Sequence, residues 1–135
     1  MVISMVEKPK IILTLNEVQA RKVIDALDLY SRLRMGQFKE IKTMFVDNGR
    51  HDLSNNDNLT DILLKLKHEI YPELGVTYHS ILSNQIPDAQ IAFDIQQVIR
   101  HGIAWYNEPE GGVFTRFDSP KKYSDQPLPE VRIEE

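Results

Sequence analysis

The chain has 135 residues, 41% of them hydrophobic and 27% charged, which is the size and composition of one globular domain. Its 16 basic and 20 acidic side chains give a formal net charge of −4, which argues against a protein that coats DNA, RNA or an anionic membrane. There is no cysteine, so disulfides, thiolate metal sites and cysteine nucleophiles are excluded. The sequence shows neither a secretory signal nor an apolar run of membrane-spanning length, and we therefore expect a cytoplasmic protein.

The chain begins with a predicted strand and a predicted long helix. Residues 10–15 are rich in β-forming side chains and lead to Asn16, a good helix N-cap, with Gln19 in the capping-box position. Apolar residues spaced three and four apart then predict a helix as far as Met35, where Gly36 terminates it.

Two more helices are predicted before the middle of the chain. Residues 37–45 have the pattern of a short helix, and residues 46–57 have the composition of a loop. A third helix follows Asp57 and stops before Pro72, because the residue that precedes a proline is disfavoured in the helical region. Its expected buried face consists of Leu59, Ile62, Leu63, Leu66 and Ile70.

The second half predicts a strand over residues 75–82, then a helix that opens at Pro87. A turn over residues 107–112 leads into a strand over residues 113–117, with Val113, Thr115 and Phe117 on one face.

The predicted fold class is α+β, with three to four helices packed on a small antiparallel sheet. We expect a single globular domain over residues 1–120. The polar, proline-punctuated residues 121–135 read as an extended C-terminal tail or arm.

Residues that could carry catalysis are sparse. His51 and Asp52 resemble the dyad of metal phosphohydrolases, but their surroundings predict a loop rather than the helix that such a site needs. The four histidines never have the i, i+4 spacing that places two imidazoles on one helical face. There is no nucleophile elbow and no phosphate loop, and Asp25 and Asp28 lie away from the apolar stripe of their helix. We expect a non-enzymatic protein without metal or cofactor, with a nucleotide hydrolase as an open alternative.

Arginines and aromatic residues form the most informative group. Arg34 stands where the apolar stripe of the first helix would continue, and Arg100 lies beside Gly102, a mid-helix glycine that calls for a closely packed neighbour or ligand. Arginine forks bind phosphate in a bidentate manner, and flat rings stack on bases. The candidate ligand-binding residues are Arg32, Arg34, Arg100, His101, Trp105, Tyr106, Arg116 and Phe117. The competing interpretation is a set of ion pairs with Asp94, Glu108 and Asp118, or a subunit interface rich in arginine and aromatic residues.

Two blocks of sequence resemble small proteins of bacteriophages and prophages. The first block is ALDLYSR at residues 26–32 with MGQF at 35–38, and the second is IAFDIQQVIRH at 91–101 with AWYNEPEGG at 104–112. In size, charge and paucity of catalytic residues the chain is also similar to phage sponges of the anti-Thoeris type. The resemblance implies an anti-defence role in the host cytoplasm, in which a cyclic nucleotide immune signal is bound without being cleaved.

The sequence therefore predicts a protein that sequesters a small phosphorylated nucleotide, such as a cyclic ADP-ribose isomer. Tight binding by so small a domain favours enclosure of the ligand between subunits, so we expect a homo-oligomer. The alternative is a protein–protein adaptor or inhibitor that acts on a host protein through Trp105, Tyr106 and the C-terminal tail.

Overall fold

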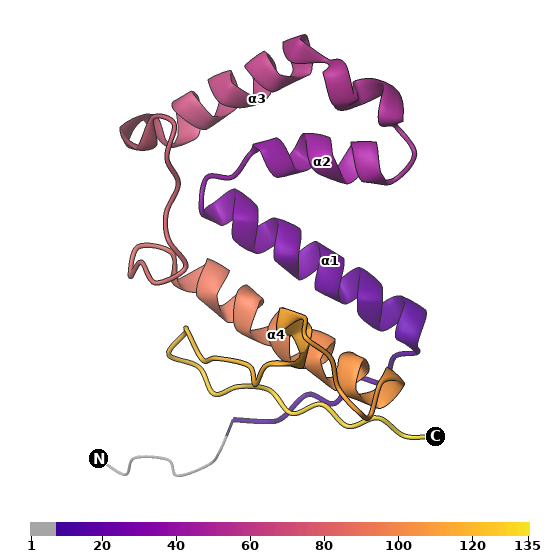
Figure 1. The fold of residues 1–135 in the computed structure, drawn as a ribbon. Helices are drawn as coiled ribbons and strands as arrows, with labels where there is room; N and C mark the ends of the chain where they lie inside the picture. The colour runs from indigo at the N-terminus through magenta and orange to yellow at the C-terminus, as the bar shows by residue number, and fades with distance from the viewer. Residues whose placement is uncertain (1–7) are drawn as a thin grey trace, which may run out of the picture.

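The computed structural model describes residues 8–135, and every regular element in that range is helical (Figure 1). The elements, in chain order, are α1 (Glu17–Arg34), α2 (Lys39–Asp47), the 3₁₀ turn η1 (His51–Asn55), α3 (Asp57–Ile70), the 3₁₀ turn η2 (Pro72–Leu74), α4 (Pro87–Asn107) and the 3₁₀ turn η3 (Thr115–Phe117). The predicted α+β class with an antiparallel sheet is therefore wrong, since no strand occurs in the described part of the chain.

All three predicted strands fail for the same physical reason, which is that none has a neighbouring strand to pair with. Residues 10–15 lack regular structure, and Ile11 and Ile12 are 93% and 89% exposed. Residues 75–82 lie partly in turns, and residues 113–117 end in the η3 turn. In that last segment Val113 is exposed and Phe117 is buried, so the two side chains do not share one face as the alternating pattern predicted. A short β-prone run acquires strand structure only when packing and pairing supply it.

Local signals place the helix ends correctly. Asn16 Oδ1 accepts the backbone N–H of Gln19 at 2.9 Å, and Gln19 Oε1 accepts the backbone N–H of Asn16 at 3.1 Å, which is the predicted capping box. Gly36 follows the end of α1 with a φ of +93°, a conformation that favours glycine. Pro87 occupies the first turn of α4, also as predicted.

The pair formed by α1 and α4 is the centre of the molecule (Figure 1). The two helices approach closely where Ser31 meets Ala89, because both side chains are small and fully buried. Ser31 Oγ donates to the Leu27 and Ala89 carbonyl oxygens, at 2.9 and 3.1 Å, so the buried hydroxyl is paired. Met35 and Ile86 pack beside this crossing and complete the small apolar core.

The C-terminal segment lies along α4 without regular structure (Figure 1). Asp94, 2% exposed on α4, accepts the backbone N–H groups of Tyr123 and Ser124 at 2.9 and 3.0 Å. Farther along, a Cβ placed on Gly102 would lie 3.0 Å from a methyl carbon of Val131. The close neighbour that the mid-helix glycine predicted is therefore a side chain of this segment.

Helix α3 is amphipathic as predicted, but most of its expected buried face is exposed. Leu63 is 5% exposed, whereas Ile62, Leu66 and Ile70 are 51%, 40% and 51% exposed. The helix packs mainly against α2 and η2, and these short elements cover only part of it. Among the described residues no helix combines the length and apolar composition that crossing a bilayer requires.

Candidate functional site

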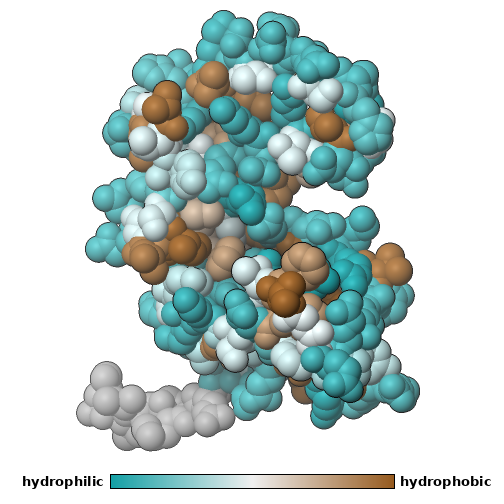
Figure 2. Space-filling model, in the orientation of Figure 1, coloured by the Kyte–Doolittle hydropathy of each residue, from teal (hydrophilic) through white to brown (hydrophobic). Residues whose placement is uncertain are grey.

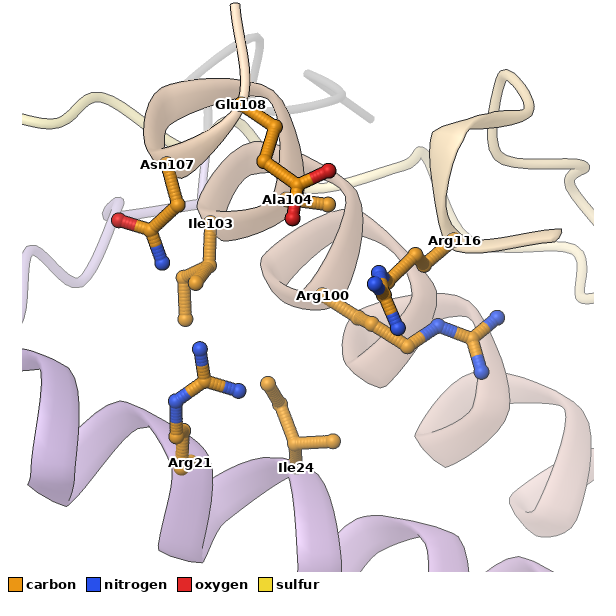
Figure 3. Close-up of a pocket in the computed structure, with 8 residues that line it drawn as sticks. All are labelled: Arg21, Ile24, Arg100, Ile103, Ala104, Asn107, Glu108 and Arg116. Atoms are coloured by element: carbon orange, nitrogen blue, oxygen red, sulfur yellow. The ribbon is translucent and has the colours of Figure 1, made fainter. Parts of the chain in front are cut away.

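A hollow of about 220 Å³ opens between the first turns of α1, the last turns of α4 and the η3 turn (Figure 3). Its lining combines three arginines with an apolar floor and two polar side chains. These residues are Arg21, Ile24, Arg100, Ile103, Ala104, Asn107, Glu108 and Arg116. Figure 3 shows the guanidinium groups of Arg100 and Arg116 on one side and that of Arg21 across from them, with the Glu108 carboxylate at the rim. The structure thus brings three cations from three separate elements to one concavity.

Two of these arginines have no acidic partner in the described chain. None of the ion pairs formed among residues 8–135 involves Arg100 or Arg116. The Nε atom of Arg100 is buried and has no hydrogen-bond partner there, and an unpaired buried donor costs about 1–3 kcal/mol. The Arg116 guanidinium carbon lies 4.7 Å from the centre of the Phe114 ring and 5.3 Å from that of Phe117. No carboxylate among residues 8–135 therefore neutralises either guanidinium group.

Glu17 arranges the opposite side of the hollow. Its Oε1 atom accepts Asn107 Nδ2 at 2.7 Å and lies 3.4 Å from Arg21 Nη2. The hydrogen bond from Asn107 and, to a smaller extent, the charge of Arg21 lower the pKa of the Glu17 carboxyl. The Glu17 carboxylate therefore joins α1 to α4 and holds the side chains of Arg21 and Asn107 in place.

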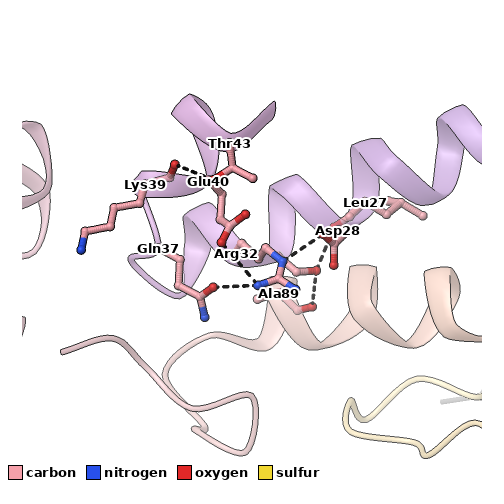
Figure 4. Close-up of polar contacts among 9 residues, drawn as sticks. Leu27, Asp28, Arg32, Gln37, Lys39, Glu40, Thr43 and Ala89 are labelled. Carbon is pink, nitrogen blue, oxygen red and sulfur yellow. Dashed lines mark hydrogen bonds and ion pairs between the residues drawn. The ribbon is translucent and has the colours of Figure 1, made fainter. Parts of the chain in front are cut away.

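The candidates Arg32 and Arg34 lie at the other end of α1, and both pair with carboxylates. Figure 4 shows the contacts of Arg32. Arg32 Nε is 2.9 Å from Asp28 Oδ2, and its Nη1 donates to Gln37 Oε1 at 3.0 Å. Arg34 Nη2 lies 3.4 Å from Asp88 Oδ2. For these two arginines the ion-pair interpretation holds, although their acidic partners are not the ones that the sequence suggested.

The candidate aromatic residues lie beside the hollow and support one of its walls. Trp105 Nε1 donates to the Phe117 carbonyl oxygen at 2.9 Å, and the two rings meet edge to face at 5.6 Å. His101 Nδ1 lies 3.3 Å from the carbonyl oxygen of Arg116. These contacts fix the η3 turn on α4, so they position the Arg116 side chain.

Tyr106 points to a different part of the chain. Its hydroxyl donates to Glu135 Oε1 at 2.7 Å, and this bond raises the pKa of the phenol. It therefore connects the end of α4 to the C-terminus and does not line the hollow.

Sequence reasoning missed Arg21 and Asn107, and it considered Glu108 only as an ion-pair partner of the arginines. Arg21 stands on an exposed polar face of its helix, and Asn107 and Glu108 fall where a turn is predicted, so the pattern offered no signal for them. Only the packing of α1 against α4 brings Arg21 to Arg100, whereas Asn107 and Glu108 lie at the end of the helix that carries Arg100. Within residues 8–135 no cluster of three histidine, aspartate or glutamate side chains could hold a metal ion.

Comparison of the chain with protein-family models, with curated proteins and with solved structures gives no match. The resemblance to phage proteins therefore stays a prediction.

Proposed function

We propose that this protein binds a small phosphorylated nucleotide in the hollow between α1, α4 and η3 and does not transform it. The observation that carries the proposal is the buried, unpaired Nε of Arg100 beside a second arginine that lacks an acidic partner among the described residues. A phosphate group supplies the oxygen acceptors that these donors lack, and charge-assisted bonds of this kind are about twice as strong as neutral ones. The proposed phosphate-binding residues are therefore fewer than the candidates from the sequence. They are Arg100 and Arg116, with Arg21 added.

The other lining groups favour a nucleotide over free phosphate. The Glu108 carboxylate and the Asn107 amide offer acceptors for sugar hydroxyls, a role that acidic side chains fill in dinucleotide sites. The ring of Phe114 is 61% exposed beneath the Arg116 guanidinium, so a base has a flat surface on which to stack. The lining contains no histidine, serine, threonine or lysine, and for this reason the proposal assigns binding and no cleavage step.

The resemblance to anti-defence sponges suggests the ligands to test first. A thermal-shift panel would hold cyclic ADP-ribose isomers, cyclic dinucleotides, ribose 5-phosphate and inorganic phosphate. At a concentration of about 100 Kd, the true ligand should raise the melting temperature by about 10 °C. Chromatography of the ligand after release should recover it unchanged. A folded protein that no phosphorylated member of the panel stabilises would refute the proposal.

Three matched variants locate the site. Arg100→Gln and Arg116→Gln should each weaken binding about 10- to 100-fold, because each loses charge-assisted bonds to phosphate. Arg34→Gln is the control, since that side chain is bonded to Asp88 at the far end of α1 and should leave affinity unchanged. Equal losses of affinity in all three variants would contradict the assigned site.

A further inference from the structure

A stripe of large apolar side chains on α3 faces solvent in the single chain. Ile62, Leu66 and Ile70 are 51%, 40% and 51% exposed, and their spacing of four residues aligns them along one side of the helix. Phe45 of α2 is 47% exposed and lines, together with Ile62, a mainly apolar hollow of about 370 Å³ between α2, η1 and α3. Figure 2 shows hydrophobic residues on the part of the surface that α3 forms. An aligned set of this kind marks an interaction surface, unlike scattered exposed apolar residues.

We propose that the stripe is covered by the same stripe of a second copy of this chain, in an antiparallel α3–α3 pair whose two-fold axis passes through Leu66. A two-fold interface requires a surface that is complementary to itself. About this axis Leu66 meets the partner's Leu66, and Ile62 faces the partner's Ile70. Every large apolar residue of the stripe therefore finds an apolar counterpart.

The charges that border the stripe fit the same arrangement. Lys65 and Glu69 are exposed and lie next to the stripe along one of its edges. Neither forms an ion pair within the described chain. In the antiparallel pair, Lys65 and the partner's Glu69 differ by two residues along the axis, which is about 3 Å at the helical rise. Two symmetric ion pairs can then form, against one contact between like charges, because the partner's Lys65 lies at the same axial offset. In a parallel pair the charged flanks of the two helices would lie on opposite sides of the interface, so these ion pairs favour the antiparallel orientation.

The exposed apolar area around the stripe is also large enough for a dimer interface. The exposed parts of Phe45, Ile62, Leu66 and Ile70 offer on the order of 400 Å² of apolar surface per chain, close to the apolar share of an interface that buries about 800 Å² per partner. The three-arginine hollow lies at the opposite end of the molecule, at the start of α1 and the end of α4. The proposed dimer therefore leaves each three-arginine hollow open, and the dimer proposal does not depend on the proposed nucleotide binding.

The first test is sedimentation equilibrium of the full chain at concentrations up to about 200 µM. The wild-type mass should approach twice the 15.7 kDa of one chain. Leu66→Glu should raise the dissociation constant at least about 100-fold, because each dimer loses the central contact and gains two apposed charges. Leu64→Glu is the matched control, since Leu64 is 41% exposed but lies on the other side of α3. A monomeric wild type, or equal effects of the two variants, would overturn the proposal and leave the stripe to another partner.

The second test exchanges the charges. Lys65→Glu and Glu69→Lys should each weaken the dimer about 10-fold, since each places like charges together twice. The double variant should regain wild-type affinity, and a mixture of the two single variants should form a heterodimer. Circular dichroism checks that every variant keeps its helices. Failure of both rescues in folded proteins would refute the antiparallel pairing.

Discussion

The buried carboxylate of Asp94 gives the sharpest test of how the C-terminal segment is held. Asp94 is 2% exposed and accepts the backbone N–H groups of Tyr123 and Ser124, at 2.9 and 3.0 Å. Asp94→Asn keeps the volume but exchanges one acceptor oxygen for an NH₂ group, so one of the two N–H groups then faces a donor. A hydrogen bond to a charged group contributes about 1.5–3 kcal/mol, and the lower desolvation cost of the neutral amide offsets part of its loss. We expect a net destabilisation of about 2 kcal/mol.

Urea unfolding measures this change, and hydrogen exchange locates it. Amides of residues 118–135 should exchange faster in Asp94→Asn, whereas amides in the middle of α1 should be protected as before. Asp125→Asn is the control, because this carboxylate is exposed on the same segment and should change stability by less than about 0.5 kcal/mol. In a chain shortened at residue 119, Asp94→Asn should cost almost nothing. An equal cost in the full and shortened chains would show that Asp94 stabilises the protein through some other contact.

Three further predictions concern the glycines and Glu17. In a Val131→Ala background, Gly102→Ala should raise the free energy of unfolding by about 1 kcal/mol, because alanine favours the helix and the Val131 methyl carbon that would crowd the new Cβ at 3.0 Å is gone. With Val131 present the same substitution should gain less in the same denaturation experiment. Gly111→Ala should destabilise by about 2 kcal/mol and alter the fluorescence of the single tryptophan, because φ is +80° and the new Cβ would lie 2.8 Å from the indole. Asn107→Ala should raise the pKa of Glu17 towards its usual 4.5, as an NMR titration can show, since the lost hydrogen bond is the main cause of the lowered value. The stabilisation from Glu17 is present above its unfolded pKa and is lost as the pH falls through the lowered folded pKa, so Glu17→Gln should remove this dependence.

The helix ends could be predicted because their signals are local. The capping box of Asn16 and Gln19, the glycine at position 36 and the proline at position 87 each act within one turn of the chain. The failure of the predicted strands could not be foreseen, because a β-prone run such as residues 10–15 becomes a strand only beside another strand. The α3 pattern identified an amphipathic helix correctly. It could not show how much of the apolar face the rest of the chain would cover.

The candidate site was only partly accessible from the sequence. Arg34, which breaks an apolar stripe, lies at the far end of α1, whereas Arg100, selected beside the mid-helix Gly102, and Arg116, selected with the aromatic group, both line the hollow. Arg21 breaks no pattern, and it reaches the site because α1 packs against α4, which follows it by more than 50 residues. The rings of Trp105 and Phe117 were expected to stack on a base. They form an edge-to-face contact with each other, with ring centroids 5.6 Å apart, and Trp105 is 40% exposed.

Some arginines form ion pairs and others do not, because only some have a carboxylate within reach. Arg32 has Asp28 one turn earlier on the same helix, and Arg34 meets Asp88 in the first turn of α4, where a carboxylate is stabilised by the helix dipole. At the other end of the α1–α4 pair, the only carboxylate that lines the hollow is that of Glu108, and it forms no ion pair with Arg100 or Arg116 within residues 8–135. Arg32 and Arg34 are thus paired where α1 ends, and Arg21 is paired with Glu17 where it begins, whereas Arg100 and Arg116 have no carboxylate partner among residues 8–135. Under the proposed function, an external anion would supply the acceptors that Arg100 and Arg116 lack among the described residues.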